Sequence, residues 1–413
     1  MDKSFFKKNR EKLYSSMKDD SVCILFAGKA PVKKGDERYP FSPDSNFYYF
    51  TGIDKENIIA VFVKKNSAMS ETLFIERSDR KKAKWVGNVI SEKECRKRSA
   101  IKEIEYLSEF KEKISNIIFE KNIHFLYLDL ENRYFEGGGI SHRFAKKIKE
   151  EYPHINIENI YYDTAKLRSV KNTYEEDNIR KAIEITKNGI YSMMKNSKPG
   201  MYEYEIEAYF DFELKKNGVR EKAFESIAAS GKNATTLHYS ENNSKTEDGD
   251  LILFDVGAKY GHYSADITRT FPVNGKFTKR QREIYDIVLE GQKKVKEAIK
   301  PGIPFKRLNE VLTEHYETEL KKIGLIKDKK EVRKYYYHGV SHLLGLETHD
   351  AGRHNEGELK VGMVLTVEPG LYIEEENIGI RIEDDVIVRE NGCEVLSEDI
   401  IRSADDIEEF MAK

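Results

Sequence analysis

Features typical of secreted and membrane proteins are scarce in this 413-residue sequence. It has only three cysteines (Cys23, Cys95 and Cys393), an odd and scattered set that excludes a disulfide framework and fits a reducing compartment. Apolar runs such as Ile58–Val63 are the length of a strand and far shorter than the ~18 residues that span a bilayer. The first residues lack the apolar core of a signal peptide. We therefore expect a cytoplasmic protein with no membrane partner.

Charge of one sign is also missing. Lys and Arg total 70 and Asp and Glu total 72, so the net charge is −2. Such a balanced chain creates no overall field that would attract nucleic acid, so we expect no nucleic-acid partner. The sequence also lacks a P-loop, a His-Glu-x-x-His motif and a Gly-x-Ser-x-Gly motif, which leaves little support for the enzyme classes that use them.

Residues 1–165 predict a mixed α/β domain. The apolar pattern predicts a helix over Phe5–Met17 and strands over Val22–Phe26, Ile58–Val63, Thr72–Ile75 and Phe125–Leu130. Asn46–Gly52 is aromatic and lies in a turn-rich stretch, so its composition predicts a loop packed by aromatic rings. A polar segment, Tyr162–Lys171, separates this region from the next.

Residues 173–403 predict an α+β domain. Thr173 and Glu176 have the spacing of a capping box, and Thr278 is a second N-cap candidate. The predicted helices are Thr173–Lys195, Glu203–Lys216, Lys279–Ile299 and Phe305–Ile323. The predicted strands are Leu251–Ala258, His262–Val273, Met363–Glu368 and Ile380–Val388.

Carboxylates interrupt these otherwise apolar strands. Asp255 follows the run Leu251–Phe254, where a buried charge is costly unless it is paired or bound to a metal. A two-residue turn at Tyr260–Gly261 would place Asp255 directly opposite Asp266. Because two like charges repel there, a bound cation would reverse the sign of their interaction.

A second pair of acids and a cluster of histidines extend this pattern. Glu368 and Glu383 have the spacing of an opposed pair around the loop Glu374–Asn377. Three of the ten histidines fall within His338–Asp350, and imidazole beside carboxylates suits Mn, Fe, Co or Zn better than Mg or Ca. Alone, Asp255 or Glu368 fits an ion pair about as well as a metal site, and each single histidine fits a hydrogen-bonded structural role better. The residues by themselves leave a two-metal site and these structural alternatives open.

At these positions the sequence resembles the aminopeptidase P and prolidase branch of the pita-bread metallopeptidases. The similar blocks, in the family's order, are Leu253–Gly257, Ser264–Phe271, His338–Asp350, Val367–Tyr372 and Gly379–Asp384. Asn46–Gly52 is similar to a motif of the family's N-terminal domain, which replaces the interpretation of that stretch as mere packing. The resemblance covers nearly the whole chain. It implies a creatinase-like α/β N-terminal domain at 1–165 and an α+β pita-bread catalytic domain at 173–403.

The resemblance also implies a metal centre. Its ligands would be Asp255, Asp266, His342, Glu368 and Glu383, around two divalent ions that are most often Mn²⁺ in the family. Asp266 and Glu383 would bridge the two ions. Asp255 would bind one ion, and His342 with Glu368 the other.

Further roles follow from the same resemblance. Glu368 would act as the catalytic acid and base, and His349 and His238 would contact the substrate and stabilise the tetrahedral intermediate. The other expected site residues, near the substrate pocket or behind the ligands, are His338, Arg381 and Tyr372. Arg381 has the alternative of a surface ion pair, and Tyr372 that of an ordinary packed tyrosine. The stretch after His349 looks shorter than in some relatives, so Arg353 is given no role.

The implied activity is that of an Xaa-Pro aminopeptidase, which releases the N-terminal residue from peptides with proline second. Ser341 in His-Gly-x-Ser-His favours this activity over a prolidase, which hydrolyses Xaa-Pro dipeptides. A non-catalytic binding protein on the same fold is a third possibility. Methionine aminopeptidases fit less well because they lack a comparable N-terminal domain. The family also implies a homodimer or homotetramer.

Overall fold

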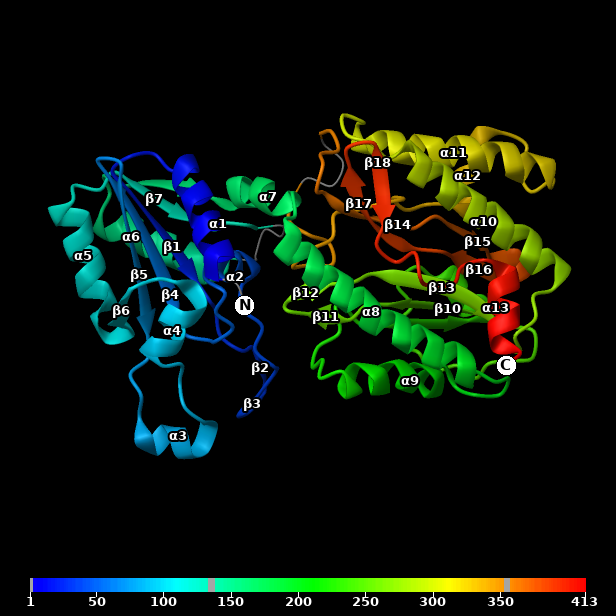
Figure 1. Cartoon of the computed structure of the whole chain (residues 1–413), viewed down its shortest axis with the longest axis horizontal. Helices are drawn as coiled ribbons and strands as arrows, with labels where there is room; N and C mark the ends of the chain where they lie inside the picture. The colour runs from blue at the N-terminus through cyan, green and yellow to red at the C-terminus, as the bar shows by residue number, and fades with distance from the viewer. Residues whose placement is uncertain (1–2, 133–137, 353–356) are drawn as a thin grey trace. The chain divides into compact units, whose positions relative to one another are not determined.

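A computed structural model of the chain describes residues 3–132, 138–352 and 357–413. It divides into two compact units, Met1–Arg168 and Ser169–Lys413 (Figure 1). Arg353 lies outside the described residues. None of the described helices combines the length and the apolar character that a membrane span requires.

The first unit is built on a six-stranded mixed sheet in the order β6-β5-β4-β1-β7-β8. Its strands are β1 (Ser21–Phe26), β4 (Ile59–Lys65), β5 (Ala68–Ile75), β6 (Glu103–Tyr106), β7 (Phe125–Leu128) and β8 (Asn156–Asn159). The central strand β1 is antiparallel to β4 and parallel to β7. Strands β2 (Val32–Lys34) and β3 (Glu37–Arg38) form a separate exposed ribbon. The predicted α/β class of this unit is confirmed.

Helices cover both faces of this sheet. The helices described in this part of the chain are α1 (Lys3–Ser16), α2 (Ser45–Thr51), α3 (Arg80–Val86), α4 (Glu92–Ser99), α5 (Phe110–Glu120), α6 (Ile140–Glu151) and α7 (Tyr161–Ser169), with a 3₁₀ turn η1 (Leu107–Glu109). On one face Val61 of β4 shares a core with Phe110 of α5 and Ile148 of α6. Phe62 points to the other face, where it meets Tyr14 of α1 and Phe50 of α2.

The structure corrects two predictions in this unit. Asn46–Gly52 is not a loop: Asp44 caps helix α2 by accepting a 2.8 Å hydrogen bond from the Phe47 N–H. Gly52 ends the helix with φ 66°, where a Cβ would lie 2.3 Å from the ring of Phe6. Most of the predicted polar connection Tyr162–Lys171 is helix α7.

The second unit contains two three-stranded sheets and two short hairpins. One sheet has the order β13-β10-β9 and the other the order β14-β17-β18. The strands are β9 (Ile227–Ser230), β10 (Leu251–Val256), β11 (Lys259–Tyr260), β12 (Tyr263–Ser264), β13 (Ile267–Pro272), β14 (Val364–Val367), β15 (Gly370–Ile373), β16 (Ile378–Arg381), β17 (Asp384–Arg389) and β18 (Gly392–Val395).

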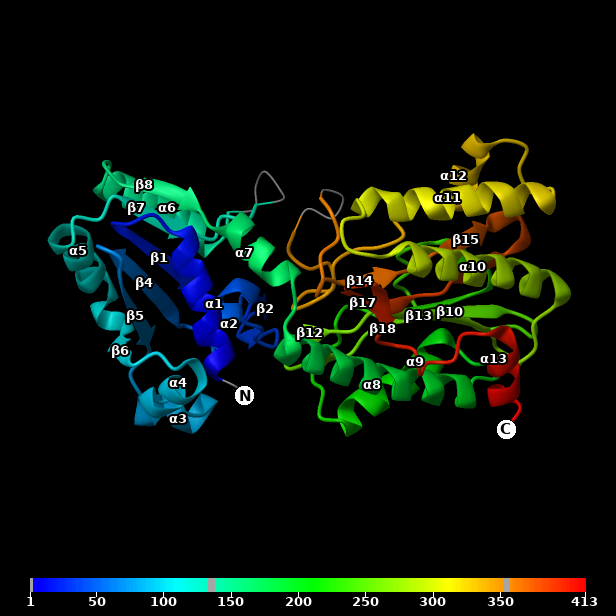
Figure 2. The same ribbon diagram turned by 45° about the horizontal axis from the view of Figure 1, so that its top comes forward.

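Two pairs of helices pack against these strands, as Figures 1 and 2 show. Helices α8 and α9 contact the strands of the first sheet, and α10, beside α11, contacts those of the second. The helices are α8 (Thr173–Asn196), α9 (Glu203–Lys216), α10 (Lys279–Ala298), α11 (Phe305–Lys322), α12 (Val332–Tyr335) and α13 (Ala404–Met411), with 3₁₀ turns η2 (Gly231–Thr235), η3 (Lys329–Glu331) and η4 (Glu374–Glu376).

Of the two N-terminal helix caps that the sequence predicted, the structure confirms one and corrects the other. The Thr278 cap of α10 is confirmed, with Gln281 completing a capping box. The box predicted for α8 is wrong by one position, because Asn172 and Glu175 form it. Asn and Ser/Thr both cap well, so the sequence pattern did not distinguish the two registers.

The register of the first hairpin differs from the prediction. Asp255 pairs with Thr268, and the tight turn is Gly261–His262, where both residues have positive φ. The predicted turn at Tyr260–Gly261 is therefore one residue too early. This moves the pairing by two positions, so Asp266 is the diagonal neighbour of Asp255 on the same face.

The second hairpin has its predicted register, but one of its predicted strands is interrupted. Ile373 pairs with Ile378 around the loop Glu374–Asn377, as expected. The predicted strand Met363–Glu368 is observed as β14, but the strand predicted over Ile380–Val388 is broken into β16 and β17, because the pairing lapses between β15–β16 and β14–β17. Glu368 and Glu383 lie where this pairing lapses.

Candidate metal centre

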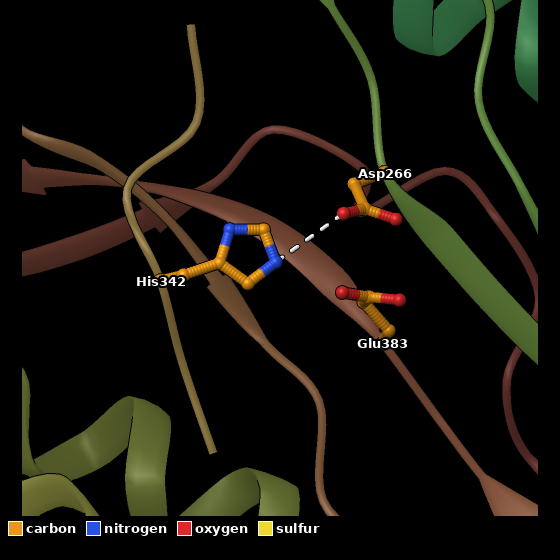
Figure 3. A group of neighbouring side chains, drawn as sticks. All are labelled: Asp266, His342 and Glu383. Atoms are coloured by element: carbon orange, nitrogen blue, oxygen red, sulfur yellow. Dashed lines mark ion pairs between the residues drawn. The ribbon is translucent and has the colours of Figure 1, made fainter. Parts of the chain in front are cut away.

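Three side chains from separate segments converge in the second unit. One carboxylate oxygen each of Asp266 and Glu383 and one ring nitrogen of His342 lie within 4.8 Å of one another (Figure 3). The Nε2 atom of His342 lies 3.3 Å from Oδ2 of Asp266 and 3.5 Å from Oε1 of Glu368. Four of the five residues expected to bind metal therefore share one neighbourhood.

Strand-like pairing positions His342. The segment that contains it lies between α12 and β14 in the chain and runs beside β14, where the Thr366 N–H donates to the His342 carbonyl and the Glu368 N–H to the Val340 carbonyl. The His342 Nδ1 atom lies 3.1 Å from the Leu343 carbonyl oxygen. Because a carbonyl only accepts, Nδ1 carries the hydrogen and Nε2 is left with a free lone pair. That lone pair faces the carboxylates, as a metal ligand requires.

Asp255 joins the site through Arg381. Its Oδ2 atom accepts a 2.6 Å hydrogen bond from Nη2 of Arg381. Its Oδ1 atom is buried and has no hydrogen-bond partner among the described residues. A buried carboxylate oxygen without a donor is costly, and a cation would satisfy it. This oxygen is the clearest sign that the residues present fit a bound metal ion.

The electrostatics of the acids point the same way. Burial, and after it the negative charge of Asp255, raises the pKa of Asp266 well above its ordinary value. Burial and the charge of Asp266 do the same to the pKa of Glu383. Burial also raises the pKa of Glu368, although His342 opposes the shift. Acids that resist ionisation together are stabilised as carboxylates when a cation lies between them.

A hydrogen-bonded chain links Arg381 to His338. Arg381 Nη1 donates to the Tyr372 hydroxyl over 3.0 Å, and that hydroxyl lies 2.9 Å from Nε2 of His338. The Nδ1–H of His338 donates to the Gly339 carbonyl, so Nε2 accepts from Tyr372. Burial, and then Arg381, lowers the pKa of His338 to about 4, so this ring is neutral at neutral pH.

The two remaining predicted histidines lie on exposed loops. The His349 ring centroid is 4.4 Å from that of His342, edge to face. The charge of His238 is among those that lower the pKa of His338. Both side chains are exposed, whereas His342 is buried.

Sequence reasoning missed two residues that hold the ligands. Thr268 donates from Oγ1 to Glu383 over 2.7 Å, and the same oxygen accepts from Nε of Arg381. Asp385 accepts a 3.1 Å hydrogen bond from the backbone N–H of Asp266. Thr268 lies two residues after Asp266, on the same strand face, and this parity is the signal that would have identified it.

Known proteins resemble both units. Residues 177–390 match metallopeptidase family M24, and residues 6–127 match the aminopeptidase P N-terminal domain. The Xaa-Pro aminopeptidase of Haemophilus influenzae is 32% identical, over 99% of this chain and 97% of the relative. An Xaa-Pro dipeptidase of Rattus norvegicus is 28% identical, over 99% of this chain and 94% of its own length.

Solved structures agree with these relatives. A Bacillus anthracis protein, described as a candidate aminopeptidase P, has a TM-score of 0.98 and 50% identity over 100% of this chain and 99% of its own. Escherichia coli aminopeptidase P with the inhibitor Pro-Leu has a TM-score of 0.92 and 30% identity over 100% of this chain and 98% of its own. The same E. coli protein has been solved zinc-substituted with product. This chain belongs to metallopeptidase family M24, with an aminopeptidase P N-terminal domain followed by a pita-bread catalytic domain.

Proposed function

We propose that this protein is an Xaa-Pro aminopeptidase, which hydrolyses the first peptide bond of peptides that have proline at the second position. The observation that carries the proposal is the cluster of Asp266, His342 and Glu383 in a chain that belongs to family M24. Full-length likeness to relatives named Xaa-Pro aminopeptidase supports the substrate class.

We assign two divalent metal ions, expected to be Mn²⁺, to five ligands: Asp255, Asp266, His342, Glu368 and Glu383. Asp266 and Glu383 would be the shared ligands, since the charges of neighbouring carboxylates raise the pKa of each. Oxygen ligands with a single imidazole suit manganese. Bound ions of this kind supply Lewis acidity, which lowers the pKa of water and polarises a carbonyl group.

A side chain of the protein, Glu368, would then transfer the proton. Glu368 lies beside His342, with its Oε1 atom 3.5 Å from Nε2 of that ring, and a carboxylate in this position can act as a general base. It would accept the proton of the attacking water and deliver it to the proline nitrogen that leaves.

The three exposed or half-buried histidines would bind the substrate. His349, next to His342, and His238 would donate hydrogen bonds to the oxygen that gains negative charge. His338 stays neutral, held by Tyr372, and would help to place the peptide. Arg381 would hold Asp255 and Tyr372 in position rather than touch substrate.

A peptide assay tests the proposal. The purified protein is given an Xaa-Pro-Xaa tripeptide, an Xaa-Ala-Xaa tripeptide and an Xaa-Pro dipeptide, each with added Mn²⁺ and with a chelator. We expect Mn²⁺-dependent release of the first residue from the proline tripeptide, and little from the alanine tripeptide. Turnover of the dipeptide alone would reassign the protein as a prolidase. Metal binding without turnover of any peptide would support a binding protein.

We further propose 1–165 and 173–403 as the functional domain limits, a cytoplasmic location and a homodimer or homotetramer. The compact units, which divide between Arg168 and Ser169, support those limits. Light scattering of the full chain measures the assembly directly, and a monomer would refute that part of the proposal.

A further inference from the structure

A buried glutamate at the start of α9 contacts the loop that carries His238. Glu203 is the first residue of α9, and its side chain has no exposed area. Its carboxylate accepts five hydrogen bonds, all from uncharged donors: the backbone N–H groups of Ser230 and Ser244, the hydroxyls of Ser230 and Tyr239, and the side-chain amide of Asn233. The distances run from 2.7 to 3.0 Å.

The donors lie at both ends of one loop. Ser230 ends β9, and Ser244 precedes β10, so the donors bracket the connection between these strands. Tyr239, which donates to Oε2 over 2.9 Å, is the residue directly after His238. One carboxylate therefore ties together the beginning, the end and the middle of the loop.

The other side of the loop packs against the β15–β16 hairpin. A Cβ on Gly379 of β16 would lie 2.0 Å from the carbonyl oxygen of Ala234 in η2, so only glycine allows this approach. The Tyr337 hydroxyl donates to the Thr235 carbonyl over 2.8 Å. The same hairpin carries Tyr372 and Arg381. The loop is thus held between α9 and the strands that carry predicted site residues.

We propose that Glu203 is a positioning residue for His238, and this inference rests on the proposed function. The His238 side chain is exposed, so the backbone of its loop determines where the ring lies. Hydrogen bonds to a charged acceptor are about twice as strong as neutral ones. The buried charge of Glu203 therefore fixes the loop more firmly than a neutral acceptor of the same shape would.

The Glu203→Gln variant tests this role, because it keeps the shape, removes the charge and places an amide donor against other donors. We expect kcat/KM on the Xaa-Pro-Xaa tripeptide to fall by about 10- to 100-fold, the range that small misplacements cost, with the metal content unchanged. Glu205→Gln is the matched control. It lies two residues along α9, is exposed, and keeps its capping role as Gln. We expect this control to behave as the wild type does.

A double-mutant cycle distinguishes positioning from general stability. If Glu203 acts through His238, then Glu203→Gln adds little to the loss caused by His238→Ala. If the two losses multiply, or if Glu203→Gln loses metal, the proposal is overturned. Tyr239→Phe removes a single donor to Glu203 and is a milder second variant, which we expect to show the same non-additivity with a smaller loss.

Hydrogen exchange tests the loop without using turnover. We expect Glu203→Gln to increase amide exchange in the segment 230–245, and to leave the exchange of α10 unchanged. Unchanged exchange in that segment would overturn the proposal. This result stands even if the protein cleaves no Xaa-Pro peptide, so failure of the inference and failure of the proposed function can be told apart.

Discussion

Glu383 and Asp384 are neighbours in the chain and are both buried, yet their surroundings differ in sign. Three cations surround Asp384: Arg269 at 2.8 Å, Lys296 at 3.1 Å and Arg402 at 3.2 Å. Burial alone would raise the pKa of Asp384, but these cations outweigh it and hold the pKa far below its ordinary value. Asp384 is a carboxylate whose charge the protein itself balances.

Glu383 has the opposite environment. After burial, the charges of Asp266 and Glu368 are the main causes that raise its pKa. Its hydrogen-bond partner is the neutral hydroxyl of Thr268. Three cations contact one of these adjacent buried acids directly, whereas only the more distant charge of Arg381 opposes the rise in the pKa of the other. Because a buried charge is costly when it is poorly compensated, Glu383 is the acid that fits the proposed metal site.

The largest effect should come from removing a charge on the cation-poor side. We expect Glu383→Gln and Asp266→Asn to lower turnover of the proline tripeptide by about 1000-fold or more, because each removes a ligand proposed to be shared. Both variants should stay folded, since each replaces a repelled charge by a neutral group of the same shape. Steady-state kinetics with excess Mn²⁺ measures the loss. Turnover near the wild-type rate would refute the ligand assignment.

The same change on the cation-rich side should damage stability instead. Asp384→Asn leaves Arg269, Lys296 and Arg402 without their anion, which we expect to cost about 3–5 kcal/mol of unfolding free energy. The folded pKa of Asp384 lies below the ordinary 3.8, so the stabilising effect is present above about pH 4 and fades as pH falls. Calorimetry of the metal-free protein at several pH values measures this. A variant as stable as the wild type at neutral pH would contradict the comparison.

Glu175 is an intermediate case. Burial raises its pKa to about 7, although Lys171 opposes the shift. A folded-state pKa raised from 4.5 destabilises the protein as pH rises towards 7, by at most about 3 kcal/mol. Glu175→Gln keeps the capping box and should therefore gain stability relative to the wild type between these pH values. Unfolding midpoints of both proteins across that range test the sign, and a constant difference would refute it.

Adding Mn²⁺ should make the smallest change in stability. Mn²⁺ at 100 times its Kd should stabilise the protein by about 2.7 kcal/mol. Since the pKa values of Asp266 and Glu383 are raised, binding should release protons, and affinity should increase with pH. Titration calorimetry in buffers of different ionisation enthalpy counts those protons. Binding that releases none would show that the acids are already ionised without metal.

Local sequence patterns predicted much of the fold. The helices of the second unit, the Thr278 cap and the pairing around Glu374–Asn377 follow from periodicity and turn residues. The turn at Gly261–His262 was missed, because His262 adopts a positive φ that its residue type rarely takes. The break at Glu383 in the strand predicted over Ile380–Val388 was missed as well. An apolar run shows where a strand is buried but not where its pairing partner changes.

The site could be predicted only in part for a related reason. The four acidic ligands stood out because acids within apolar strands are unusual, and His342 stood out as part of a histidine cluster. The resemblance then implied that these five residues form one ligand set. Thr268 and Glu203 did not stand out, because a threonine in a strand and a glutamate at a helix start are both common. Their roles depend on contacts between residues far apart in sequence: 115 positions separate Thr268 from Glu383. Only the tertiary structure brings such residues together.

The central claim is that four buried acids and His342 hold two metal ions. Equilibrium dialysis against Mn²⁺, followed by elemental analysis, tests it most directly. The predicted result is two ions per chain for the wild type and for Asp384→Asn, and fewer than two for Glu383→Gln. A wild-type protein that binds no Mn²⁺, or a Glu383→Gln variant that still binds two ions, would contradict it.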